Sequence, residues 1–410
     1  MLSWEHTPDI TPMQCCRAWV EIDLDALRHN VRALKALLGD QDLMAVVKAD
    51  AYGHGAVTVA KTALEAGATW LGVATVPEGI ELRQAGIPVP IMVMGAVNSL
   101  TEVQAMGRWQ LQPTLVNPKQ ALMFSEGIAS TRLGDPLGKH QRLPVHLKLD
   151  TGMSRLGFAW EQAVEFYQFV AQLPHLAIAS VYSHLATADD PDPTVMQQQQ
   201  QRFEAAIAQL KTGGFKPPKL HLANSAATLV GPDLHYDMVR VGLALYGLYP
   251  ALHLRDSIDL RPVLQVKARI THLKAIAAGT GVSYGHRFIA QAPMRIAVVG
   301  IGYADGVPRL LSDRLSVLVQ GQSARQLGAI TMDQMMIDVT HLPQVQEGDT
   351  VTLIGQSAAN MESSSHSAEA WANLLGTISW EILCGFKHRL PRITLHERAT
   401  ATAIQQQSRR

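Results

Sequence analysis

Short apolar runs alternate with segments of helical periodicity from residue 18 to about residue 248. The apolar runs are AWVEI, MAVVK, WLGVAT, VPIMVMG, LQPTL, PVHLKLD, AIASVYSH, LHLAN and MVRVGLALYG. Amphipathic segments lie between most of them, including residues 24–38, 56–66 and 194–210. Repeated strand-then-helix units predict parallel strands joined by crossover helices. Nine candidate strands are one more than an eight-stranded β/α barrel needs, so the pattern predicts a barrel with one surplus strand or a doubly wound open sheet.

The segment VHLKLD (residues 145–150) favours the barrel. Its apolar residues alternate with His146, Lys148 and Asp150, and side chains two residues apart along a strand point to the same face. A strand with one apolar and one polar face fits the inner mouth of a barrel better than a sheet covered by helices on both sides.

The pattern changes after Pro250. From residue 262 to about residue 355, turn signals rather than long helices separate the apolar runs, which predicts a β-rich second domain. We also expect a solvated helix face at the glutamine run 197–201 and a polar serine-rich insertion at 356–370. The predicted organisation is an N-terminal extension (1–16), an α/β barrel (17–255), a mainly-β domain (256–395) and a mobile tail (396–410).

The charge balance disfavours two classes of partner. The 410 residues include 35 Lys and Arg against 35 Asp and Glu, so no net field attracts nucleic acid or an anionic membrane. Three cysteines, Cys15, Cys16 and Cys384, suit neither a disulfide framework nor a zinc site, so we expect no metal and a reducing compartment. The N-terminus lacks the apolar segment of a signal peptide, and no run approaches the roughly 20 apolar residues that span a bilayer. A cytoplasmic location is therefore expected.

Lys48 ends the apolar run MAVVK, where a charged amine is costly to bury. A lysine at the carboxyl end of a barrel strand lies where such folds place active sites, and burial makes it a nucleophile by lowering its pKa. The alternative is a structural lysine paired with Asp50. The AYGHG that follows offers glycines for close approach to an anion and the Tyr52 hydroxyl as a donor. A phosphate held beside an amine is the arrangement that a pyridoxal phosphate site needs.

Two further barrel segments each have a functional and a structural interpretation. In HLANSAAT (221–228), Asn224 or Ser225 caps a helix, and the same helix start could bind an anion. In MVRVGLALYG, Arg240 interrupts an apolar strand and must meet a partner, which is either a structural carboxylate or a ligand. Gly242 would allow backbone N–H groups to approach that ligand closely.

Three candidates lie on predicted loops. Arg155 follows the strand LKLD on a glycine-containing loop and suits recognition of a carboxylate. In GVSYGHRF, Tyr284 is more simply a packing aromatic than a catalyst. In TMDQ (331–334), nothing local indicates more than a strand edge.

Taken together, eight segments resemble the alanine racemase family in their order and spacing. They are AVVKADAYGHG, LKLDTGMSRLG, YSHLATAD, HLANSAA, VRVGLALYG, GVSYG, GYADG and TMDQ, and with RAWVEIDLDALRHN the likeness covers roughly residues 17–395. The resemblance implies an N-terminal (β/α)8 TIM-like barrel and a C-terminal mainly-β domain, with which the surplus strand AWVEI packs. It implies a fold-type III pyridoxal 5'-phosphate enzyme that interconverts L-alanine and D-alanine and supplies D-alanine for peptidoglycan. It also implies a homodimer whose subunits share their active sites.

The resemblance further implies roles for individual residues. Lys48 would hold the cofactor as a Schiff base and take the proton from D-alanine, and Tyr284 of the partner subunit would take the proton from L-alanine. The other cofactor contacts would come from Tyr52, His184, Ser225, Arg240, Gly242 and Leu243, with Arg240 facing the pyridine nitrogen. Substrate contacts would come from Arg155 and Met332, with Lys148, His221 and Asp333 in supporting positions. Lys148 aligns with a lysine that is carbamylated in several members.

Three positions depart from the family pattern. His388 and Trp380 stand where tyrosine is more usual, and Ala329 replaces an arginine found in some members. The rival hypotheses are a pyridoxal phosphate decarboxylase of ornithine or diaminopimelate, a racemase that prefers serine, and a cofactor carrier without catalysis. The β domain with GVSYG disfavours the carrier, which needs no second base.

Overall fold

The computed structural model describes residues 16–131, 142–355 and 366–396, and the chain divides into two compact units. Unit 1 comprises Met1–Asp25, Tyr52–His54 and Pro262–Arg410, and unit 2 comprises Ala26–Ala51 and Gly55–Arg261. The predicted mobile tail lies outside the described residues except for its first residue, as does nearly all of the predicted N-terminal extension. Within the described ranges, no helix has the length and apolar character needed to cross a membrane.

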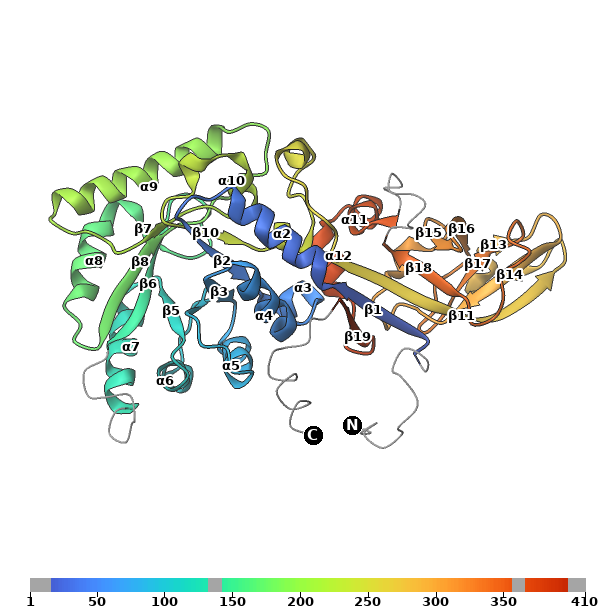
Figure 1. The fold of residues 1–410 in the computed structure, drawn as a ribbon, viewed down its shortest axis with the longest axis horizontal. Helices are drawn as coiled ribbons and strands as arrows, with labels where there is room; N and C mark the ends of the chain where they lie inside the picture. The colour runs from blue at the N-terminus through green and yellow to red at the C-terminus, as the bar shows by residue number, and fades with distance from the viewer. Residues whose placement is uncertain (1–15, 132–141, 356–365, 397–410) are drawn as a thin grey trace, which may run out of the picture. The chain divides into compact units, whose positions relative to one another are not determined.

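Unit 2 is a parallel β/α barrel (Figure 1). Its strands are β2 (Asp42–Val46), β3 (Trp70–Val73), β4 (Ile91–Val93), β5 (Gln112–Leu115), β6 (Leu143–Asp150), β8 (Leu176–Tyr182), β9 (Leu220–His221) and β10 (Met238–Val241). They follow the order β10-β2-β3-β4-β5-β6-β8-β9, with the short β7 (Phe158–Ala159) paired to β6. Backbone hydrogen bonds from Asp237 N to Leu220 O at 3.0 Å and from Arg240 N to Ala223 O at 3.1 Å join the two ends of this order. The barrel is therefore confirmed over the open sheet.

Among the described residues, eight helices accompany the barrel strands, and some of them begin at a side-chain cap. They are α2 (Leu24–Ala36), α4 (Ala56–Ala66), α5 (Val76–Gln84), α6 (Leu100–Arg108), α7 (Pro118–Thr131), α8 (Ala163–Ala171), α9 (Thr194–Thr212) and α10 (Ser225–Val230). Thr75 and Glu78 form a capping box at α5, and the Asn224 side chain accepts from Ala227 N at the start of α10. The predicted helix 56–66 is confirmed with the same bounds.

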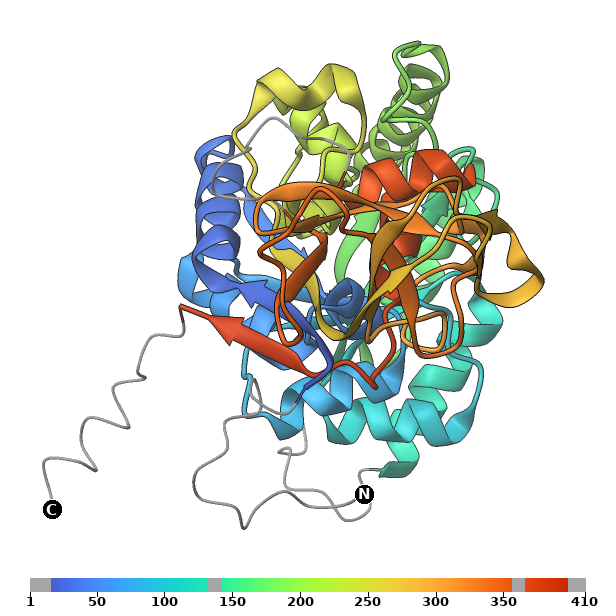
Figure 2. The ribbon, with the colours of Figure 1, turned by 90° about the vertical axis from the view of Figure 1, so that its right-hand side faces the viewer.

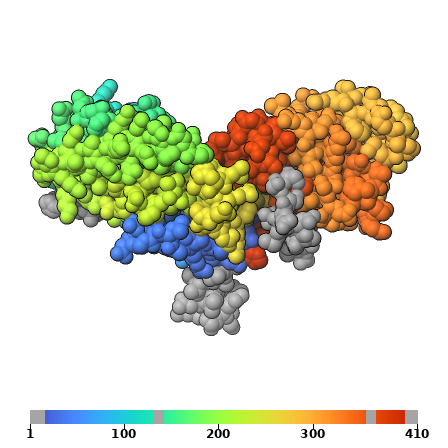
Figure 3. Space-filling model, turned by 90° about the horizontal axis from the view of Figure 1, so that it is seen from above, coloured from blue at the N-terminus to red at the C-terminus, as the bar shows by residue number. Residues whose placement is uncertain are grey.

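The glutamine run corrects one prediction. α9 lies on the surface of unit 2 (Figure 3), and Gln197, Gln198 and Gln201 are exposed as expected of a solvated face. Gln199, however, is only 1% exposed. Its inward position follows from helical periodicity, because Met196 and Phe203, three residues before it and four after it, are buried on the same face.

The segment after β2 has an uncommon backbone. The turn labelled α3 (Lys48–Gly53) is left-handed, with φ of 52° at Ala49, 52° at Asp50, 53° at Ala51 and 56° at Tyr52. L-residues adopt this region rarely and as single residues, at roughly 1–2 kcal/mol each. The sequence predicted only a glycine-rich helix start here, and the right-handed helix α4 begins later, after Gly55.

Unit 1 is built mainly from antiparallel strands (Figure 2). They are β1 (Ala18–Asp23), β11 (Leu264–Ile276), β14 (Met294–Val299), β15 (Ser316–Val319), β16 (Gln322–Leu327), β17 (Met335–Asp338), β18 (Thr350–Ile354) and β19 (Arg392–Leu395), with a separate pair β12 (Gly281–Val282) and β13 (Phe288–Ile289). The main order is β14-β17-β16-β15-β18-β11-β1-β19, and the long strand β11 also pairs with β14, which closes an antiparallel barrel. β1 pairs antiparallel with β11 and parallel with β19.

Two helices of unit 1 were not predicted. They are α11 (Ala368–Leu375) and α12 (Ser379–Gly385). Residues 366–370 were assigned to the serine-rich insertion, but the Ser367 hydroxyl accepts from Ala370 N at 3.1 Å and caps α11. The rest of that predicted insertion, 356–365, lies outside the described residues.

Candidate active site

Lys48 lies just beyond the carboxyl end of β2 and is partly buried. The two residues after it enter the left-handed turn, where Ala49 N donates to Glu78 Oε1 at 2.8 Å. The Asp50 carboxylate accepts from Ala56 N at 2.8 Å, and the Asp50 carbonyl accepts from Gly55 N at 3.0 Å. Asp50 therefore caps α4 and fixes the turn that follows Lys48.

Arg240 is a buried cation, 4% exposed, that projects from β10. Its guanidinium contacts His221 Nδ1 at 2.9 Å and His184 Nδ1 at 3.0 Å, and donates to the carbonyls of Ser183 at 2.8 Å and Leu222 at 3.1 Å. The prediction that Arg240 must meet a partner is confirmed. All four partners are neutral groups, so the carboxylate alternative is wrong within the described residues. Burial lowers the pKa of Arg240 to about 10.

Three further cations act on one another around Arg240. Lys148 on β6 is 5% exposed, and its pKa is lowered to about 8 by burial and then by the charges of Arg240, Arg155 and Lys48. Burial and the same cations hold the pKa of His184 well below its ordinary value, so this ring is neutral. A barrel mouth with four mutually repelling cations is suited to an anionic ligand.

Ser225 joins α10 to the segment after β10. Its hydroxyl oxygen accepts from Gly242 N at 3.0 Å and from Ala244 N at 3.4 Å. Because the oxygen acts as acceptor in both contacts, the hydroxyl proton remains to be donated to another group. Leu243 follows at the start of the short turn η4 (Leu243–Tyr246).

Tyr284 lies in unit 1 and is 71% exposed. The interpretation of Tyr284 as a packing aromatic is therefore wrong for this chain by itself. It opens the tight turn η6 (Tyr284–His286), which is fixed because the Ser283 hydroxyl donates to Ala329 O at 2.6 Å. Ser283 has φ of 63°, and a fixed turn of this kind presents one side chain outward.

Met332 is also exposed, at 53%, and lies in a tight turn rather than on a strand edge. Thr331 N donates to Gln334 O at 2.9 Å, and Gln334 N donates back to the Thr331 hydroxyl at 3.2 Å. The Met332 carbonyl accepts from Ala304 N at 3.0 Å, so this turn is tied to the GYADG segment.

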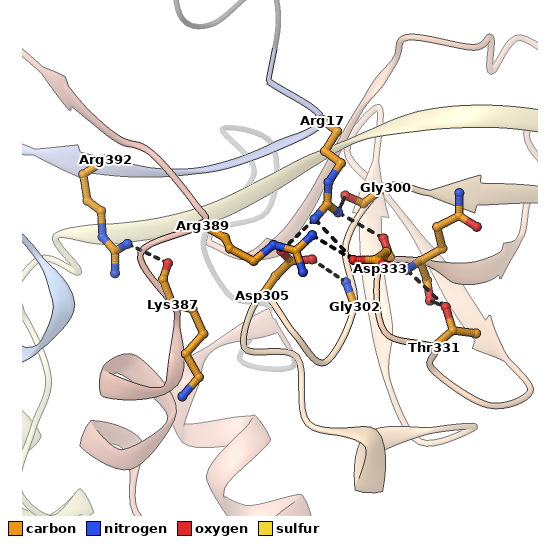
Figure 4. A network of polar contacts seen from close by, with 10 residues as sticks. Arg17, Gly300, Gly302, Asp305, Thr331, Asp333, Lys387, Arg389 and Arg392 are labelled. Carbon is orange, nitrogen blue, oxygen red and sulfur yellow. Dashed lines mark hydrogen bonds and ion pairs between the residues drawn. The ribbon is translucent and has the colours of Figure 1, made fainter. Parts of the chain in front are cut away.

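Figure 4 shows the ionic network beneath that turn. Asp305 of GYADG is fully buried and pairs with Arg17 at 2.8 Å and with Arg389 at 3.4 Å. Arg389 also pairs with Asp333 at 2.8 Å, and Arg17 donates to the Asp333 carbonyl at 3.0 Å. The sequence singled out Asp333 but not Asp305, although a carboxylate between glycines in an apolar strand-and-turn segment was a signal for a buried partner.

Tyr52 and its neighbours belong to unit 1. Burial, with a smaller effect of Cys384, raises the pKa of Tyr52 to about 12. At Gly53, a Cβ would lie 2.7 Å from Leu383 O, so only glycine fits there. The positions that depart from the family differ in burial: His388 is exposed, Trp380 is partly buried and Ala329 is fully buried.

The predicted site residues thus fall into two sets. The set in unit 2 comprises Lys48, Lys148, Arg155, His184, His221, Ser225, Arg240, Gly242 and Leu243. The set in unit 1 comprises Tyr52, Tyr284, Met332 and Asp333. Sequence reasoning missed Gln112 and Ser180, which lie behind Arg240, because no local pattern marks a polar residue in a strand as the neighbour of a distant one.

Comparisons with known proteins cover nearly the whole chain. Residues 22–250 match the family described as "Alanine racemase, N-terminal domain" and residues 263–394 match "Alanine racemase, C-terminal domain". The chain is 64% identical over 378 residues to an alanine racemase of Nostoc sp., with 92% of this chain and 95% of the relative covered. It is 60% identical over 380 residues to one of Synechocystis sp., with 92% and 99% covered. The solved alanine racemase of Clostridium difficile matches with a TM-score of 0.86 at 34% identity, over 94% of this chain and 96% of that one.

Proposed function

Because the chain belongs to the alanine racemase family and is therefore an isomerase, we propose that it interconverts L-alanine and D-alanine by a two-base mechanism. Lys48 and Tyr284 of the partner subunit are the two bases, and pyridoxal 5'-phosphate is the cofactor. The observation that carries the cofactor assignment is the buried Arg240, whose protein partners are all neutral, among three further cations.

The donor set fits this cofactor. Lys48, on the edge of the cationic cluster, would hold the aldehyde carbon, and the Ser225 hydroxyl has a proton to donate to the phosphate. Gly242 and Leu243 place backbone next to Ser225. Arg240 would face the pyridine nitrogen as a donor that does not readily give up its proton. When bound, pyridoxal phosphate supplies a conjugated ring that takes up charge and so acidifies the Cα–H of the amino acid.

Two bases are needed because racemisation removes a proton from one face of Cα and returns one to the other. A single base would tend to return the proton to the face from which it came. Lys48 takes the proton from D-alanine, and Tyr284 takes it from L-alanine.

The substrate carboxylate needs a separate anchor. Arg155 follows β6 on a loop fixed by the Asp150 carboxylate, which accepts from Gly152 N at 2.9 Å and Ser154 N at 3.0 Å. A guanidinium there can bind a carboxylate with two hydrogen bonds. The exposed turn with Met332 is the second carboxylate contact, and Asp333 supports it through Arg389.

The cellular role follows from the reaction. We propose that the enzyme works as a cytoplasmic homodimer with shared active sites and supplies D-alanine for peptidoglycan. The exposure of Tyr284 and Met332 in a single chain supports shared sites, because a partner subunit can reach side chains that the chain itself does not cover.

The test is proton exchange in D2O with each enantiomer, followed by optical rotation and by loss of the Cα proton signal. The loaded wild type is expected to be yellow and to drive either enantiomer to a near-equal mixture with deuterium at Cα. Tyr284→Phe should largely lose turnover of L-alanine, because the second base is gone. His286→Ala, on the same exposed turn, serves as the control and should retain turnover. Exchange at Cα without mixing of the enantiomers would exclude the two-base mechanism.

A further inference from the structure

Five neighbouring barrel strands each contribute one polar residue to a continuous hydrogen-bonded chain that ends at Arg240. From β5 to β10, Gln112 Oε1 contacts His146 Nε2 at 2.9 Å, His146 Nδ1 contacts Ser180 Oγ at 2.6 Å, and Ser180 Oγ contacts His221 Nε2 at 2.7 Å. The last contact joins His221 Nδ1 to Arg240 at 2.9 Å. His146, Ser180 and His221 are each 0% exposed, so water cannot replace any of these contacts.

The chemistry of the two ends sets the direction of the whole chain. A guanidinium only donates, so while Arg240 keeps this position His221 Nδ1 accepts and the ring proton is on Nε2. Burial lowers the pKa of His146 to about 3 and that of His221 well below its ordinary value, so each ring carries one proton. Ser180 then accepts from His221 and donates to His146 Nδ1, and His146 Nε2–H donates to the Gln112 carbonyl oxygen. In this arrangement both ring N–H groups and the Ser180 hydroxyl proton have an acceptor.

Aromatic packing fixes the planes of the two rings. Tyr182 stacks on His221 with ring centroids 4.7 Å apart and an interplanar angle of 6°, and its hydroxyl is fixed by Thr114 Oγ1 at 2.9 Å. The His146 ring meets Trp70 edge-on at 5.7 Å. A flipped His221 ring would stay in the same plane but would place carbon atoms against Arg240 and Ser180, so both hydrogen bonds would be lost.

We propose that Ser180 and His146 are positioning residues that hold His221 in the Nε2-protonated tautomer, so that Arg240 keeps a fixed acceptor and a fixed orientation. This role rests on the proposed function, since the orientation of Arg240 matters for racemisation only if Arg240 faces the cofactor ring. With His221 in the other tautomer, an N–H would face the guanidinium N–H groups, and Arg240 would have to move. Ser180 links the two histidines in this hydrogen-bonded chain, because its hydroxyl can accept from one imidazole and donate to the other.

The tautomers can be measured directly in the full-length protein. Histidine-selective 15N labelling and long-range 1H–15N correlation spectra distinguish protonated from unprotonated ring nitrogens, and His146→Gln and His221→Gln variants assign the signals. The wild type is expected to have unprotonated Nδ1 in both rings. Ser180→Ala removes the hydroxyl and should give His221 a mixture of tautomers, whereas Ser180→Thr keeps the hydroxyl and should restore the single form. Ser125→Ala, which removes a buried hydroxyl from α7, should change neither ring.

Kinetics of the loaded enzyme give the second readout. Ser180→Ala should lower kcat by about tenfold or more with little change in KM, as is typical when a residue behind a contacting group is lost. Ser180→Thr should recover most of that loss. A wild-type His221 protonated at Nδ1 would overturn the proposal, and so would a Ser180→Ala variant with wild-type tautomers and kcat. Absence of racemase activity in the wild type would instead refute the proposed function, and the tautomer spectra would still decide the structural assignment.

Discussion

At the scale of single residues, Gln199 has a role that its neighbours in the glutamine run do not share. Its side-chain oxygen accepts from Ala186 N at 2.8 Å, and its side-chain nitrogen donates to His184 O at 3.0 Å. One carboxamide thus binds both ends of the three-residue segment that carries His184. Since His184 Nδ1 contacts Arg240, a helix on the outside of the barrel fixes a residue of the candidate site.

Gln199→Ala should lower the free energy of unfolding by about 1–3 kcal/mol, because two partly buried backbone hydrogen bonds lose their side-chain partner. The exposed Gln198→Ala serves as the control and should stay within about 0.5 kcal/mol of the wild type. Urea unfolding followed by circular dichroism measures both. Equal changes in the two variants would show that the hydrogen bonds of Gln199 add nothing measurable to the free energy of unfolding.

At the scale of the element, the left-handed turn after Lys48 is held by its surroundings against its own backbone preference. Ala51 N donates to Val47 O at 2.9 Å, and the Asp50 and Glu78 carboxylates bind backbone N–H groups at its two ends. Backbone conformations of this kind persist where neighbouring structure over-determines them, which is typical of functional sites.

Replacing an alanine of this turn with glycine should therefore stabilise the protein. Ala49 is exposed and has φ of 52°, so Ala49→Gly should raise the free energy of unfolding by up to about 1 kcal/mol. Ala208 is exposed in the right-handed helix α9, and Ala208→Gly should lower the free energy of unfolding by about 1 kcal/mol. Thermal unfolding of the two variants measures the sign directly. A loss of stability in both would mean that the turn is not left-handed.

Two aspartates of the network in Figure 4 are expected to contribute unequally to the free energy of unfolding. Asp305 is fully buried, pairs with Arg17 and Arg389 and accepts from the buried Gly302 N, so Asp305→Ala should cost about 1–3 kcal/mol of unfolding free energy by leaving that N–H without its acceptor. Asp333 is half-exposed, and Asp333→Ala should cost only about 0–1 kcal/mol although it shares Arg389. The two denaturation midpoints compare them, and equal midpoints would show that burial does not set the strength of these pairs.

The sequence predicts an element where residues close together in the chain determine its conformation, and it does not where contacts between distant residues determine it. Periodicity predicted the barrel strands and the helix Ala56–Ala66, since each pattern reports one buried face. The same reasoning missed the turn at 49–52, because propensities place no alanine in a left-handed conformation. It also placed Gln199 on a solvated face, because the polar composition of the glutamine run was given more weight than the helical periodicity of the buried residues around it. The contact of Ser180 with His146 and His221 depends on strands far apart in the chain, and no local pattern encodes it.

At the scale of the whole molecule, the proposed homodimer with shared sites makes a prediction that a single chain cannot satisfy. Lys48→Ala and Tyr284→Phe should each be nearly inactive alone, because every site of either homodimer lacks one base. Co-expressed, they form mixed dimers in which one site keeps both bases and the other lacks both. Random pairing makes half of the dimers mixed, so about a quarter of the wild-type activity should return.

The measurement is racemase activity of the co-expressed variants, purified through two different affinity tags so that only mixed dimers remain. Those dimers should have about half the wild-type activity per dimer. If co-expression of the two inactive variants restores no racemase activity, both bases of a site come from the same subunit. The control is the double variant paired with wild type, which keeps one base at each site and should be nearly inactive.

The turn at Ala49–Tyr52 has the handedness that a polypeptide of D-residues would adopt. L-alanine at positions 49 and 51 is held there in the conformation that its mirror image prefers. A chain assembled by chemical ligation with D-alanine at those two positions would fit the turn with less strain than the natural one. The backbone beside Lys48 would thus be best built from the D-enantiomer of alanine, the amino acid that the enzyme is proposed to make.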